Sequence, residues 1–182
     1  MKGLSLALAL TLGLSAAPLA ASIVTVGTPL AQDCFTWAER RDPRPDALET
    51  CTRALREPLD IENRAATLVN RGVIRLIHND LPGAEADFDA AIALRPNLSD
   101  AWLNKGFIRL RTGDGSAALP LLERALDLRA RRPALAYFAR GIAHEQAGNV
   151  RAAYADLVRA RDLEPGWSMP QQALARYSVV ER

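Results

Sequence analysis

The chain has 182 residues, of which 49% are hydrophobic but only 5% aromatic. Together with the absence of sustained alternation between apolar and polar residues, this composition favours close-packed helices rich in Ala and Leu over a β-sandwich. The formal net charge of +2 provides no basic footprint of the kind that nucleic-acid binding requires, so nucleic acid is excluded as a partner.

The first 31 residues have the layout of a secretory signal peptide. One lysine, Lys2, precedes an uncharged apolar run and then small residues around Ala20–Ser22. We expect cleavage between residues 21 and 31 and a periplasmic or secreted protein. Because the run Leu4–Leu30 is long enough to span a bilayer, an uncleaved inner-membrane anchor is the alternative, and only then is membrane contact expected.

Residues 32–63 are predicted to form a helical hairpin that contains both cysteines of the chain. Cys34 and Cys51 flank a helical piece, a Pro-rich turn and a second helical start over residues 46–55. An oxidising compartment favours their pairing, which stabilises a loop of this length by about 3 kcal/mol. The alternative, a redox or catalytic thiol, requires a CxxC pair or a nearby base, and neither is present in the sequence.

An internal repeat follows. Gly72, Gly106 and Gly141 recur at intervals of 34 and 35 residues. Two series of alanines keep the same intervals: Ala84, Ala118, Ala153 and Ala91, Ala125, Ala160. A period of this size with two helical segments per unit is typical of a solenoid. We therefore divide residues 64–167 into three units, 65–98, 99–133 and 134–167, and assign residues 168–182 to a C-terminal capping helix that covers the last unit.

The repeat resembles the tetratricopeptide repeat (TPR) family in its pattern of large residues, glycine, alanines and a final proline. The matching residues beyond those glycines and alanines are Leu68, Phe88 and Pro96 in unit one, Trp102 and Leu122 in unit two, and Tyr137, Leu157 and Pro165 in unit three. The resemblance implies an all-α fold, an α-solenoid of three helix-turn-helix units. With the two cysteines in front, the chain is similar to small exported TPR proteins of Gram-negative bacteria.

Basic residues precede each repeated glycine, where the family usually has an apolar residue. We expect ion pairs within units one and three, Arg71 with Asp87 and Arg140 with Asp156, whereas Lys105 lacks the equivalent acidic partner in unit two. The alternative is that these cations form a row that meets an acidic ligand.

The sequence carries no recognisable catalytic chemistry. No nucleophile, nucleotide-binding or Walker-type motif is present, and neither His78 nor His144 has a second metal ligand at helical spacing. We therefore predict no enzyme, no catalytic residue, no cofactor, no metal and no small-molecule substrate.

The resemblance places the partner-binding surface on the concave face, which the first helices of the units line. Carried over to this chain, the groove residues are Val69, Val73, Leu76, Ile77, Leu103, Phe107, Leu110, Arg111, Phe138, Ile142 and Glu145. Because this groove is mostly apolar, we expect a protein or peptide partner and a non-enzymatic interaction module of the cell envelope that binds an apolar helix or extended peptide. In the alternatives, the chain's own N-terminal segment or a second copy fills the groove of a structural protein, or the chain is an accessory subunit of an envelope enzyme complex.

Overall fold

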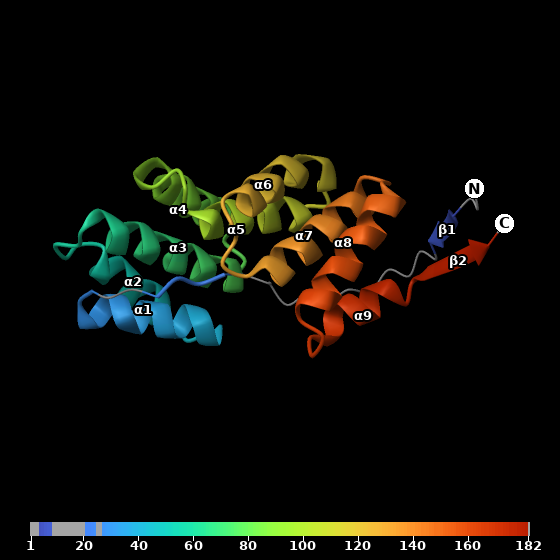
Figure 1. Ribbon diagram of the computed structural model, residues 1–182. Helices are drawn as coiled ribbons and strands as arrows, with labels where there is room; N and C mark the ends of the chain where they lie inside the picture. Colours follow the sequence, from blue (N-terminus) through green and yellow to red (C-terminus); the bar gives the residue numbers. More distant parts are fainter. Residues whose placement is uncertain (1–3, 9–20, 25–26, 182) are drawn as a thin grey trace.

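The computed structural model describes residues 4–8, 21–24 and 27–181, and these ranges are mainly helical (Figure 1). The helices in them are α1 (Pro29–Arg40), α2 (Ala47–Ala54), α3 (Ile61–Ile77), α4 (Leu81–Leu94), α5 (Ser99–Arg111), α6 (Gly115–Asp127), α7 (Pro133–Gln146), α8 (Val150–Leu163) and α9 (Ser168–Leu174). None of them is long and apolar enough to cross a membrane.

The helices stack in chain order as an elongated solenoid. Helices α3 and α4, α5 and α6, and α7 and α8 form three antiparallel pairs, and each pair packs on the next through α4 against α5 and α6 against α7. Helices α1 and α2 cover the first pair, and α9 covers the last. The expected α-solenoid with its N-terminal hairpin and C-terminal capping helix is therefore confirmed.

The repeated glycines lie where the two helices of a unit approach each other closely. A Cβ atom built on Gly72 would lie 2.4 Å from the ring of Phe88, and one built on Gly106 would lie 2.5 Å from Leu122. Both of these large side chains are fully buried. The helices can approach this closely because the repeated position has no side chain.

Each unit turns between its helices through a residue in the left-handed region. Asn79 (φ 62°), Gly113 (φ 76°) and Gly148 (φ 78°) occupy this position in units one, two and three. Asp80 and Asp114 then cap the second helices of units one and two, because their carboxylates accept hydrogen bonds from main-chain N–H groups of the first turn.

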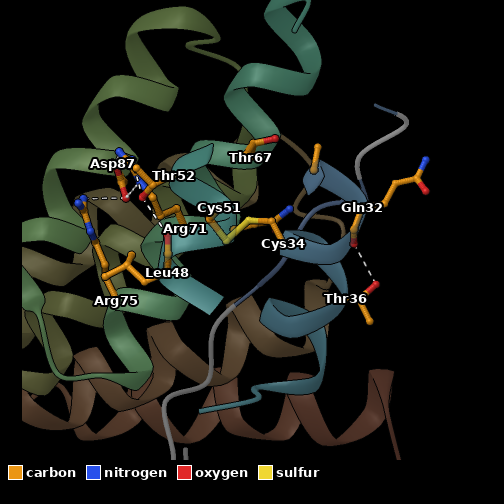
Figure 2. The surroundings of a disulfide bond; sticks show 12 residues. Gln32, Cys34, Thr36, Leu48, Cys51, Thr52, Thr67, Arg71, Arg75 and Asp87 are labelled. Atoms are coloured by element: carbon orange, nitrogen blue, oxygen red, sulfur yellow. Dashed lines mark hydrogen bonds and ion pairs between the residues drawn. A yellow bond between two sulfur atoms is a disulfide. The ribbon is translucent and has the colours of Figure 1, made fainter. Parts of the chain in front are cut away.

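The predicted disulfide between Cys34 and Cys51 is confirmed. It joins α1 to α2, and both cysteines are fully buried (Figure 2). Next to it, Arg71 of α3 pairs with Asp87 of α4 at 2.6 Å and donates to the Thr52 hydroxyl of α2. The hairpin is thus attached to the first unit by a polar contact as well as by apolar packing.

The structure differs from the sequence-based expectations at both ends. Helix α9 ends at Leu174, short of residue 182, and β2 (Tyr177–Glu181) follows it, pairing antiparallel with β1 (Leu4–Leu8). Both strands pair through main-chain groups, which a prediction built on helical periodicity does not reveal. Helix α1 begins at Pro29, inside the stretch assigned to the signal peptide, because Thr28 caps it and a proline suits the first turn. Most of the predicted signal peptide, including residues 9–20, lies outside the described residues.

Candidate functional site

Two buried asparagines, one in α3 and one in α5, hold an extended segment of the chain by its main chain. The Asn104 side chain accepts a hydrogen bond from the Ala21 N–H at 2.9 Å and donates to the Ala21 carbonyl at 2.8 Å. Asn70 makes the same pair of bonds with Ile23, both at 2.7 Å. Each primary amide thus satisfies both main-chain groups of one residue, an arrangement that recognises a backbone without regard to its side chain.

The segment 21–24 crosses the first helices of units one and two. Asn70 lies in α3 and Asn104 in α5, and the segment passes both helices before α1 begins (Figure 1). It runs opposite to the order of the units, because its earlier residue contacts unit two and its later residue contacts unit one.

Alternate side chains of this segment point in opposite directions, as in a β-strand. Ala21 is fully buried and Ile23 is 7% exposed, whereas Val24 is 53% exposed. Ile23 joins the buried cluster that contains Val69 and Val73, and Ala21 joins the cluster that contains Leu103 and Phe107. The inward-facing side chains therefore pack into the apolar clusters that the repeat helices form.

The groove residues expected from the sequence divide into three sets by exposure. The buried ones are Val69, Val73, Leu76, Leu103, Phe107 and Phe138; the half-buried ones are Ile77, Leu110, Ile142 and Glu145; Arg111 is exposed.

Two of these residues have partners within the chain. Arg111 donates to the Leu76 carbonyl and to the Asn79 side chain, which links unit two to unit one. The Glu145 carboxylate accepts hydrogen bonds from Arg176 at 2.7 Å and from the Tyr177 hydroxyl at 2.8 Å. In this structure both residues connect parts of the solenoid, and a role for either in binding a partner stays a prediction.

The outward-facing residues of the segment line a polar pocket of roughly 370 Å³. Its lining residues come from the segment, α1 and the residue after it, the start of α5, and the turn between α6 and α7: Ser22, Val24, Phe35, Glu39, Arg41, Asp100, Arg131 and Arg132. Asp100 is 2% exposed, and burial raises the pKa of its carboxyl above the ordinary value against the attraction of Arg131 and Arg132. The pKa of Arg41 is lowered by burial and by the nearby Arg132 guanidinium.

The expected intra-unit ion pairs are confirmed. Arg71 pairs with Asp87, and Arg140 pairs with Asp156 at 2.7 Å, and both carboxylates are buried. Lys105 instead reaches Asp89 in the preceding unit at 2.5 Å. Because these cations already have acidic partners, the structure favours the structural reading of this row over a row that meets an acidic ligand. Among the residues that the structure describes, no cluster of His, Cys, Asp and Glu could hold a metal ion.

The groove residues expected from the sequence include neither Asn70 nor Asn104, and they do not include the segment that these asparagines hold. A signal was present, because asparagine occupies the same repeat position in units one and two, directly before the basic residue and glycine. Unit three has Ala139 there, so the asparagine series ends after two units. The three arginines of the pocket gave no comparable signal, because they belong to separate parts of the chain.

The fold defined by these stacked helix pairs is a tetratricopeptide repeat solenoid, which confirms the resemblance found in the sequence. Solved structures of MamA, a TPR-repeat protein, are similar to it. MamA from Desulfovibrio magneticus RS-1, residues 41 to the end, aligns with a TM-score of 0.63 and 27% identity over 81% of this chain and 82% of that chain. The RS-1 double mutant of MamA aligns with a TM-score of 0.63 and 26% identity over the same shares of each chain. No protein-family model matches the sequence, and the search of curated proteins gives no match.

A fold of this kind indicates a scaffold for protein–protein interaction. Solenoids of this kind form extended concave surfaces that can bind another polypeptide, and recognition by such a surface requires no catalytic group. A TPR-type protein that takes part in protein–protein interaction therefore agrees with the sequence-based prediction.

Proposed function

We propose that this protein is a non-enzymatic interaction module of the bacterial cell envelope that binds an extended polypeptide by its main chain. The observation that carries this proposal is the pair of amide side chains, Asn70 and Asn104, each hydrogen-bonded to both main-chain groups of one residue. An extended ligand fits this geometry because its main-chain N–H and C=O groups recur along the strand and are free to bind a partner. In a helix these groups are hydrogen-bonded to one another. Of the two ligand forms expected from the sequence, this favours the extended peptide over the apolar helix.

In the full chain the occupant of the groove is its own segment 21–24. This supports the alternative in which the chain's N-terminal segment fills the groove. A groove filled by the chain's own segment and a groove that binds a partner are successive states of one protein if a signal peptidase cuts between residues 21 and 31. Cleavage would remove part or all of the segment and leave the apolar surface near Val69 and Phe107 open to a partner.

Two features support a place in the envelope. The first is the arrangement of the N-terminal residues, with one cation, an apolar run and small residues. The second is the disulfide between Cys34 and Cys51, which persists in an oxidising compartment. Cell fractionation together with N-terminal sequencing of the purified protein tests this part of the proposal.

The binding experiment uses a chain that begins at Gly27 and a labelled synthetic peptide with the sequence of residues 19–26. We expect binding that Asn104→Ala and Asn70→Ala each weaken by roughly tenfold, because each change removes two hydrogen bonds. Fluorescence anisotropy measures the affinity, and thermal unfolding shows whether each variant is folded.

The matched control is Asn97→Ala, which removes an exposed asparagine from the turn between units one and two. It should leave the affinity unchanged. If the double variant Asn70→Ala, Asn104→Ala folds and still binds the peptide as tightly as the wild type, the two asparagines do not form the binding site and the proposal is wrong.

A further inference from the structure

The pocket beside the groove contains more positive than negative charge. Arg41, Arg131 and Arg132 supply three guanidinium groups, whereas Glu39 and Asp100 supply two carboxyl groups. In the part of the chain that the structure describes, none of the three guanidiniums has a carboxylate within 4.0 Å or a hydrogen-bond acceptor. This differs from Arg71 and Arg140, whose guanidiniums bind buried carboxylates directly.

The carboxyl groups of this pocket leave part of its positive charge unbalanced. The guanidiniums of Arg41 and Arg132 lie close enough to repel each other, which contributes to the lowered pKa of Arg41. The Asp100 carboxyl attracts Arg131 and Arg132 electrostatically, but it forms no ion pair with either guanidinium among the described residues.

The segment in the groove presents its side chains to this pocket at every second position. Ser22 and Val24 line the pocket, whereas Ala21 and Ile23, which alternate with them, face the repeat helices. Ser22 is half-buried, whereas more than half of the Val24 surface is exposed. A charge at position 22 is therefore better shielded from water than a charge at position 24, and it interacts more strongly with the arginines.

We propose that the preferred partner of the groove is an extended segment that carries Asp or Glu at the position now taken by Ser22, so that its carboxylate binds the guanidiniums of Arg41, Arg131 and Arg132. This inference rests on the proposed function, since it assumes that the main chain of the partner follows the path of residues 21–24. A carboxylate suits the pocket because guanidinium groups bind it with paired, charge-assisted hydrogen bonds. The residue on each side of the acidic one is small or apolar, as Ala21 and Ile23 are.

The test places the acidic residue in the segment of the full 182-residue chain. Ser22→Asp is compared with Ser22→Asn, a neutral change of nearly equal size, and NMR measures amide hydrogen exchange at Ala21 and Ile23. We expect exchange in the Asp variant to be slower than in the Asn variant by about tenfold or more, because charged hydrogen bonds are the stronger kind.

The arginines are tested in the same background. Arg131→Ala combined with Arg132→Ala should remove most of the difference between the Asp and Asn variants. Arg124→Ala, which removes an exposed cation of α6 outside the pocket, should leave the difference unchanged. Equal or faster exchange in the Asp variant would overturn the inference, as would a difference that survives the loss of both arginines. Protection that increases with protein concentration would also overturn it, because a second copy would then be the occupant.

One further variant separates this inference from the proposed function. Asn104→Ala in the otherwise unchanged full chain should accelerate exchange at Ala21. If it does not, the main-chain recognition in the proposed function is wrong. If it does and Ser22→Asp has no effect, the groove holds the segment but the acidic preference is wrong.

Discussion

At the scale of single residues, the repeated glycines occupy one position of the repeat but have different neighbours. A Cβ built on Gly72 would lie 2.4 Å from the rigid, fully buried ring of Phe88. One built on Gly141 would have its nearest contact at 3.0 Å, to Leu157. Real Cβ atoms do not approach other heavy atoms as closely as 2.4 Å, so one of the two helices in unit one would have to move to accept a methyl group.

We therefore predict that the substitution by alanine is costly in unit one and tolerated in unit three. Gly72→Ala should lower the free energy of unfolding by about 2 kcal/mol through overpacking. Gly141→Ala should change it by less than about 1 kcal/mol, because the higher helix propensity of alanine offsets the smaller clash. Urea denaturation followed by circular dichroism measures both, and equal losses in the two variants would contradict the assignment of the clash to Phe88.

At the scale of the helix pair, units one and three use the same ion pair in different surroundings. The Asp87 carboxylate is held by two guanidiniums, Arg71 at 2.6 Å and Arg75 at 2.8 Å. Asp156 has one guanidinium, that of Arg140, and the imidazole of His144 only at 3.9 Å. Both carboxylates are buried, so the loss of stability on removing the arginine depends on whether a second cation remains beside the carboxylate.

We predict that Arg140→Ala destabilises the protein more than Arg71→Ala. Removing Arg140 leaves a buried carboxylate without a cation and should cost about 2 to 3 kcal/mol, somewhat below the range for fully buried pairs because Arg140 is partly exposed. Removing Arg71 leaves Asp87 paired with Arg75, and the cost should be about 1 kcal/mol. Denaturant unfolding at pH 7 measures the difference. Arg140→Ala combined with Asp156→Asn should recover part of the loss, and no recovery would show that the effect comes from lost packing.

At the scale of the whole molecule, the parts that could be predicted are those in which one interaction recurs along the chain. The glycine and alanine intervals give the helix pairs because close helix approach makes the same demand in every unit. Arg71 with Asp87 and Arg140 with Asp156 could be paired in advance because both partners keep their repeat positions. In these cases the position in the repeat was enough to predict which residues contact each other.

The candidate site could not be predicted in the same way, because its parts do not repeat. Asn70 and Asn104 bind a segment that reads as an export signal, so their partner lay outside the predicted fold. Arg41 follows α1, whereas Arg131 and Arg132 lie in the turn between α6 and α7. Only the folded chain brings these places together beside the groove. The pairing of β1 with β2 likewise joins the two ends of the chain.

The final prediction concerns how far a local change spreads along the stack. Glu145 of α7 accepts hydrogen bonds from Arg176 and Tyr177, and so attaches the residues after α9 to the third unit. Because each unit of a solenoid contacts only its neighbours, Glu145→Gln should accelerate amide exchange in α7 and α9 by about tenfold and leave α2 and α3 unchanged. Glu164→Gln, at an exposed position after α8, is the matched control and should alter neither end. Hydrogen exchange read by mass spectrometry distinguishes the outcomes: acceleration confined to the C-terminal helices supports nearest-neighbour stability, whereas equal acceleration in α2 and α3 would mean that the solenoid unfolds as one cooperative unit.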